Sequence, residues 1–217
     1  GRGREMLMEL ADDVILPLVN ETDCVVSVTG SGDPFGSQHF RYVIKNLERR
    51  PTPNLHLQTN GLLFDERAWT DLELDGKVSS VQVSMDAASE EVYSVVRKLG
   101  DFRRLLKNLR FISGLRRDGK IGHLRLDFVV QVTNFEDMPG FVGIGRALDV
   151  DCVSFNGITN WGTFTPAQFA HHAIWSSEHP RFDEFLRVLR SPTLTWDRIW
   201  WGSLSDLLGI ARAGAEV

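Results

Sequence analysis

The stretch CVVSVTGSGDP, residues 24–34, joins a run of apolar and β-branched residues to a glycine-rich turn. Two further strand-like runs lead into polar turns, in LHLQTNG at residues 55–61 and in VSSVQVSMDAAS at residues 78–89. Each run predicts a buried strand, and each is followed by apolar residues at helical spacing. Parallel α/β folds build their ligand sites from polar residues at the carboxyl ends of successive strands. The three turns are therefore the first candidates for a binding site.

Working outward from these stretches, strands and helices alternate along the chain. The expected strands are residues 24–29, 55–58, 78–85, 124–132 and 152–155. The expected helices are residues 5–19, 37–48, 65–72, one that Ser89 caps, 102–115 and 135–148. Such alternation predicts an α/β fold with a parallel sheet and right-handed crossovers. It leaves open whether the sheet is a closed barrel, a partial barrel or an open sheet.

Composition narrows the class of protein. A chain of 217 residues, 42% of them hydrophobic, can bury one sizeable core, so one domain is the default. We expect a core over residues 1–191 and an amphipathic, tryptophan-rich tail over residues 192–217 that packs on the core or on a partner. The net charge of −5 disfavours nucleic acid as the main partner. The basic residues between 97 and 125 are expected to form a solvated helix face. No apolar run reaches the length of a membrane span, and we expect a cytoplasmic protein.

The two cysteines limit the metal chemistry of the chain. Cys24 and Cys152 each begin a strand-like run, in TDCVV and VDCVS, at the opposite strand end from the polar turns. We expect two buried thiols and no disulfide. Two cysteines cannot supply the three thiolates of an iron-sulfur cluster, so no metal site is expected in this chain.

Taken singly, the polar residues of the turns allow two interpretations. The carboxylate of Asp33 can accept from an ammonium group or can close an ordinary turn. Asn60 can contact a ligand or only adopt a left-handed conformation before its glycine. Ser84 and Asp86 alternate on one side of a strand end, which packing explains less well. Arg97 can bind a carboxylate through two hydrogen bonds or lie at the surface.

Taken together, the motifs GSGDP, LQTNG, VSMDAAS and VYSVVR resemble the core domain of radical SAM enzymes in order and spacing, over residues 24 to about 160. The resemblance implies that Asp33 meets the amino group of S-adenosylmethionine and that Ser84 and Arg97 meet its carboxylate. Aspartate stands at position 33 where the family usually has glutamate, and Ala87 where it has glycine. The implied cofactor-binding residues are Ser31, Gly32, Asp33, Thr59, Asn60, Ser84, Asp86, Arg97, Gln131 and Asn134. Gln131 and Asn134 are candidates for ribose or adenine contacts, and Asn156 and Trp161 are candidates for the far wall of the ligand site.

One part of the family pattern is missing. Radical SAM enzymes cleave S-adenosylmethionine with a four-iron, four-sulfur (4Fe-4S) cluster, which a Cys-x3-Cys-x2-Cys loop holds between the first strand and the first helix. Residues 1–10, GRGREMLMEL, read as that first helix, so strand and loop are absent together. The resemblance therefore implies a partial TIM-type (β/α) barrel whose first β strand is absent. It also implies the downstream part of a radical SAM enzyme, inactive as the chain stands. The sequence does not identify the substrate, which is a small molecule or a peptide.

Two other functions stay open. The chain can be a cluster-free α/β module that binds a nucleotide-like ligand or a protein partner. As a separate point, the edge strand 24–29 and the tryptophan-rich tail are candidate surfaces for self-association. Another barrel enzyme is the weakest alternative. A Schiff-base aldolase needs a lysine at a strand end, whereas every lysine falls in a helix or loop. A metal hydrolase needs clustered histidines and carboxylates, and the six histidines show no such grouping.

Overall fold

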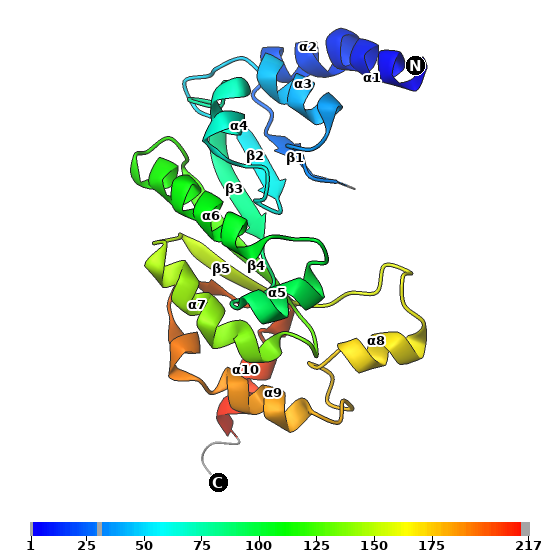
Figure 1. Cartoon of the computed structure of the whole chain (residues 1–217), viewed down its shortest axis with the longest axis vertical. Helices are drawn as coiled ribbons and strands as arrows, with labels where there is room; N and C mark the ends of the chain where they lie inside the picture. Colours follow the sequence, from blue (N-terminus) through cyan, green and yellow to red (C-terminus); the bar gives the residue numbers. More distant parts are fainter. Residues whose placement is uncertain (1, 30–31, 214–217) are drawn as a thin grey trace. The chain divides into compact units, whose positions relative to one another are not determined.

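The computed structural model describes residues 2–29 and 32–213. The chain divides into two compact units (Figure 1). The first unit consists of the residues up to Ser84 together with Arg104–Leu124, and the second consists of Met85–Arg103 together with the residues from Arg125 onward.

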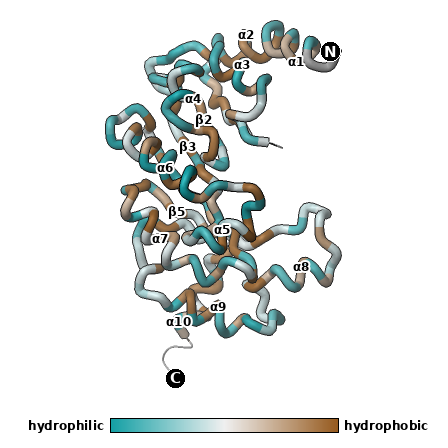
Figure 2. The backbone as a smooth tube through the Cα atoms, viewed as in Figure 1, coloured by the Kyte–Doolittle hydropathy of each residue, from teal (hydrophilic) through white to brown (hydrophobic). Residues whose placement is uncertain are grey.

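The first unit is built on three parallel strands in chain order, β1 (Val26–Val28), β2 (Leu55–Thr59) and β3 (Val78–Ser84). Leu55 and Leu57 are buried and alternate with more exposed residues, as expected of a strand with one face on a core. Figure 2 colours the backbone by hydropathy, and brown, hydrophobic stretches lie near the labels of β2 and β3. The helices of this unit are α1 (Arg2–Leu10), α2 (Leu16–Glu21), α3 (Gln38–Asn46), α4 (Glu66–Asp71) and α6 (Phe102–Arg117).

The helix expected over residues 5–19 is interrupted in the structure. A π-helical segment, Ala11–Ile15, separates α1 from α2. In an α-helix, side chains spaced four residues apart point in slowly changing directions around the axis, because one turn takes about 3.6 residues. A π-helical turn is wider and therefore compensates for this change of direction. The side chains of Met6, Leu10, Val14 and Leu18 have this spacing, and all four are exposed. These four apolar positions therefore do not mark a buried face of the helix.

The second unit also has three parallel strands in chain order, β4 (His123–Val130), β5 (Cys152–Gly157) and β6 (Ile199–Trp200). Its core contains the rings of Phe128, Phe141 and Phe155, whose centroids lie 4.9–5.9 Å apart. The helices are α5 (Glu90–Val96), α7 (Met138–Ala147), α8 (Pro166–His172), α9 (Phe182–Leu189) and α10 (Leu207–Ala213), with 3-10 turns at Phe135–Asp137, Pro192–Thr195 and Gly202–Leu204.

The fold class predicted from the sequence is confirmed: the chain is α/β, with parallel strands of the partial (β/α)-barrel type rather than a closed barrel. The tryptophan-rich tail adds a strand that its pattern did not predict, since Ile199 pairs with Val153 of β5. The ring of Trp201 stacks on Phe155 with centroids 5.2 Å apart. The charged residues of α6 are exposed, as expected of a solvated helix face, except for Arg116, which is half-buried. No helix in the described part of the chain is long and apolar enough to cross a bilayer.

Candidate functional site

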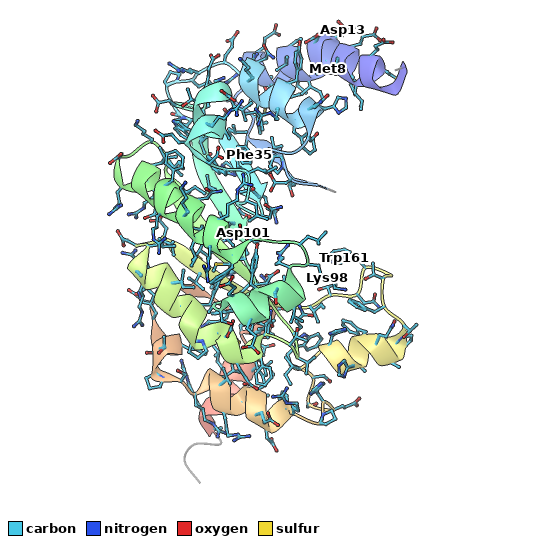
Figure 3. All side chains as sticks on the ribbon, in the orientation of Figure 1. Met8, Asp13, Phe35, Lys98, Asp101 and Trp161 are labelled. Carbon is cyan, nitrogen blue, oxygen red and sulfur yellow. The ribbon has the colours of Figure 1, made fainter. Side chains whose placement is uncertain are left out.

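The turn after β1 is organised by the carboxylate of Asp33. Its Oδ1 accepts from the backbone N–H of Phe35 at 3.0 Å, and its Oδ2 accepts from Thr59 Oγ1 at 2.6 Å and from the Asn60 N–H at 2.8 Å. The carboxylate therefore joins the turn to the end of β2. Gly32 has a φ of +137°, a conformation that favours glycine. Ser31 lies outside the described residues. Figure 3 labels Phe35 on the segment between β1 and α3.

The Thr59-Asn60-Gly61 turn is held from both sides. Asn60 Oδ1 accepts from the N–H of Leu62 at 2.9 Å, which closes an Asx turn. Gly61 has a φ of +77°, and a Cβ there would lie 2.6 Å from the Cδ1 atom of Leu105, so a larger residue does not fit. The amide of Asn108 on α6 donates to the carbonyls of Gly61 and Leu62 at 2.8 and 3.1 Å.

In the second unit, the buried carboxylate of Asp86 forms an ion pair with the half-buried Arg97. Arg97 Nη2 lies 2.5 Å from Asp86 Oδ2, and Asp86 Oδ1 accepts from the N–H of Val129 at 2.8 Å. Burial raises the pKa of the Asp86 carboxyl, while the positive charge of Arg97 opposes that rise. Asp86 has a φ of +61°, which is uncommon for a residue with a side chain. The Nε–H of Arg97 is buried and has no hydrogen-bond partner in the described part of the chain.

Asn134 supports this ion pair from the end of β4. Its Nδ2 donates to the carbonyls of Asp86 and Val129, both at 2.9 Å, and its Oδ1 accepts from the Gln131 N–H at 2.9 Å. The amide of Asn134 is thus satisfied within the protein and nearly fully buried. The side-chain amide of Gln131, by contrast, makes no hydrogen bond to the residues that the structure describes. Ser84 is the last residue of β3 and is half-buried.

Two polar residues that organise these turns were not predicted from the sequence. Asp137 Oδ2 accepts from the N–H groups of Ala88 and Ser89 at 2.7 and 3.0 Å and from the Ser89 hydroxyl at 3.1 Å. Ser89 caps α5 as expected, by accepting from the Val92 N–H. Asn108 had a signal in the sequence, because helical spacing puts it between Leu105 and Ile112 on the apolar face of α6.

The residues present do not fit a 4Fe-4S cluster. Cys24 and Cys152 are the only cysteines in the sequence, and both are half-buried rather than buried as predicted. Burial raises the pKa of the Cys152 thiol, which disfavours the thiolate form that binds metal. Within the described residues, no three histidine, cysteine or acidic side chains are grouped so that they could hold a metal ion.

No protein-family model matches the sequence. A curated relative, the probable GTP 3',8-cyclase of Methanocaldococcus jannaschii, is 26% identical over 123 residues, which are 56% of this chain and 38% of the relative. Among solved structures, Streptococcus suis SuiB bound to S-adenosylmethionine matches with a TM-score of 0.51 at 15% identity, over 71% of this chain and 35% of that one.

These likenesses support a radical SAM core domain in this chain. It therefore has the fold that the order of GSGDP, LQTNG, VSMDAAS and VYSVVR predicted. The chain spans well under half the length of the curated relative and of SuiB. The likeness accordingly concerns a core domain, and the activity of a whole protein is proposed below.

Proposed function

We propose that this chain is the downstream, S-adenosylmethionine-binding part of a radical SAM enzyme, and that Arg97 binds the carboxylate of the methionine moiety. The buried Nε–H of Arg97, which lacks a partner among the described residues, carries the proposal. A buried donor without an acceptor is costly, and a ligand carboxylate would satisfy it. Asp86 occupies Nη2 and holds the guanidinium in place, so the remaining N–H groups are available to the ligand.

The other implied contacts divide by their remaining hydrogen-bonding capacity. Gln131 has a side-chain amide available for a ribose or adenine contact, whereas the amide of Asn134 is satisfied and positions Asp86. In the first unit, Asp33 already accepts three hydrogen bonds. A carboxylate has about four acceptor sites, so Asp33 can still accept from an ammonium group. We further propose Gly32, Thr59, Asn60 and Ser84 as ligand contacts.

The cluster chemistry cannot come from these residues. When bound in the family, the 4Fe-4S cluster supplies the electron that cleaves S-adenosylmethionine, and three thiolates hold it. We propose that a segment outside these residues supplies them, and that the chain alone does not cleave S-adenosylmethionine under reducing conditions. The relative named for GTP makes a nucleotide one candidate substrate for the whole protein.

Isothermal titration calorimetry with S-adenosylmethionine and with 5′-methylthioadenosine tests the role of Arg97. The second ligand has the same adenosine and sulfur but no amino-acid carboxylate. We expect S-adenosylmethionine to bind with a dissociation constant of about 0.1–1 mM, because the ordering cost offsets much of a few charge-assisted hydrogen bonds. Arg97→Lys should weaken it about tenfold, since lysine lacks the planar fork, and should leave 5′-methylthioadenosine unaffected.

Arg103→Lys is the matched control, because Arg103 is exposed and pairs with Glu90 in the same unit. Equal binding of S-adenosylmethionine by the wild type and the Arg97→Lys variant would contradict the role of Arg97. Absence of any binding at millimolar concentration would contradict the proposed function. Submicromolar binding by this chain alone would favour the alternative, a cluster-free module for a nucleotide-like ligand.

A further inference from the structure

A cavity lies in the second unit, and none of the residues implied to bind S-adenosylmethionine lines it. Its volume is about 600 Å³, which falls in the range of small-molecule sites. The walls come from α8, from the segment between α8 and α9, and from Val132 after β4. Figure 1 shows α8 joined to β5 by the long loop that carries Trp161, labelled in Figure 3.

Two aromatic rings form the apolar wall of this cavity. Phe169 and Trp175 both line it, and they meet edge to face with their centroids 6.2 Å apart. Trp175 lies directly against the backbone of Gly157, where a Cβ would be only 2.5 Å from the indole Nε1. Close packing of this kind holds the indole in one position. The wall is therefore fixed before any ligand arrives, which lowers the entropic cost of binding.

His179 gives the cavity a rigid polar base. The side chain is 8% exposed. Its Nδ1 accepts from the N–H of Arg181 at 3.1 Å, so the ring proton lies on Nε2, which is 3.1 Å from the carbonyl of His171. Both ring nitrogens are thus used within the protein. Next to the cavity, burial lowers the pKa of His172 and so disfavours its charged form.

The acidic and the basic side chain at the rim, Glu178 and Arg181, differ in whether they are already paired. Arg181 lines the cavity, but its guanidinium pairs with Glu136 at 2.5 Å and with Glu184 at 2.8 Å. The carboxylate of Glu178, also at the cavity, makes no hydrogen bond or ion pair within the described part of the chain. Two carboxylates thus neutralise Arg181, whereas the carboxylate of Glu178 has no such partner within the described residues. The rim suits a cation and disfavours a phosphate or carboxylate ligand.

We infer that this cavity binds an arylalkylamine, that is, an aromatic ring joined by a short chain to an ammonium group. The ring packs against Phe169 and Trp175, and the ammonium group donates to Glu178. The aromatic wall explains the preference for a ring, because edge-to-face and offset contacts between rings are favourable. The unpaired carboxylate explains the preference for a cation. This inference rests on residues that the proposed S-adenosylmethionine site does not use.

Equilibrium dialysis with three indoles of different charge tests the inferred preference for an arylalkylamine. Tryptamine carries an ammonium group, tryptophol is neutral and indole-3-propionate is an anion, and all three share one ring. We expect tryptamine to bind about threefold to fivefold more tightly than tryptophol, as for an exposed ion pair, and indole-3-propionate to bind most weakly. Glu178→Gln should remove the difference between tryptamine and tryptophol and leave the binding of tryptophol unchanged.

Two substitutions on one helix test the location. Ala170 and Ala167 are both exposed on α8, but only Ala170 lines the cavity. Ala170→Phe fills the space and should weaken all three indoles at least about tenfold, because a packed site does not expand freely. Ala167→Phe should change nothing, and circular dichroism checks that both variants fold.

The outcomes separate clearly. The expected charge order, lost in Glu178→Gln and with binding abolished only in Ala170→Phe, supports the inference. Equal binding of the three indoles, tightest binding of the anion, or no binding up to the solubility limit would overturn it. Equal loss in Ala170→Phe and Ala167→Phe would also overturn it, since the ligand would then lie elsewhere. Arg97→Lys should leave tryptamine binding intact, so failure here is distinguishable from failure of the S-adenosylmethionine proposal.

Discussion

Replacing Asp33 with alanine should destabilise the first unit more than any change at an ordinary surface aspartate. The carboxylate accepts from the Phe35 N–H, the Thr59 hydroxyl and the Asn60 N–H, at 3.0, 2.6 and 2.8 Å. Two of these donors are on the backbone, and none of the three can follow the shortened side chain. Asp33→Ala therefore removes the link between the turn after β1 and the end of β2.

The magnitude follows from these three bonds. A hydrogen bond to a charged group contributes about 1.5–3 kcal/mol when shielded, and a neutral one about 1 kcal/mol. Asp33 is half-buried, so water replaces part of each bond, and we take about 1 kcal/mol for each, or about 3 kcal/mol in total. For a chain of this size, that corresponds to a fall of about 6–12 °C in Tm.

Urea unfolding followed by circular dichroism measures the loss, and hydrogen exchange at the Asn60 amide shows whether it is local. Asp33→Asn should lose about half as much, because its amide keeps one acceptor oxygen but turns a donor toward other donors. Asp75→Ala is the matched control: Asp75 is an exposed residue of the same unit, and its loss should change stability by less than about 0.5 kcal/mol. If Asp33→Ala is no more destabilising than Asp75→Ala, the role given to Asp33 is wrong.

Two further predictions concern the second unit. Because burial raises the pKa of Asp86 in the folded state, the folded protein keeps the Asp86 carboxyl protonated to a higher pH than the unfolded chain does. The contribution of this group to stability is therefore highest at low pH, and it falls as the pH rises from the pKa of the unfolded state through the raised pKa of the folded state. Unfolding free energies measured against pH should show this fall in the wild type and not in Asp86→Asn, and parallel curves would contradict it. Gly157→Ala should displace the Trp175 indole, because the new Cβ lies within 3 Å of three of its atoms. We expect an altered near-ultraviolet circular dichroism spectrum and a loss of about 1–3 kcal/mol. Gly143→Ala on α7, where no atom lies within 4 Å, should instead stabilise by about 0.5–1 kcal/mol.

The strands and most helices could be predicted because their patterns are local. Alternation in Leu55–Thr59 and the cap at Ser89 depend on residues within one turn or one strand. The π-helical segment Ala11–Ile15 and the strand Ile199–Trp200 could not be predicted in this way. The two residues of that strand have too little pattern of their own, and pairing with β5 decides their conformation.

The candidate site was predictable as a set of positions but not as a set of roles. Residue type and strand-end placement selected Asp33, Asp86 and Asn134, and each does lie in an ordered turn. Their partners are distant in sequence, however: Asp33 bonds to Asn60, and Asn134 to Asp86. Sequence pattern does not show whether such a side chain is already satisfied by the protein. Asp137, which joins Ala88 and Ser89 across almost fifty residues, was missed for the same reason.

Hydrogen-bonding capacity therefore separates the residues that should govern folding from those that should govern binding. In the second unit the contacts form a series, in which Asn134 donates to the Asp86 carbonyl and the Asp86 carboxylate pairs with Arg97. Only the last member has a buried donor that lacks a partner in the described part of the chain. Substitution of Asn134 should thus reduce stability and affect a ligand through the position of Arg97. Substitution of Arg97 should affect the ligand directly through its unused donor, and Arg97→Lys tests this role because it keeps a positive charge beside the buried Asp86 carboxylate.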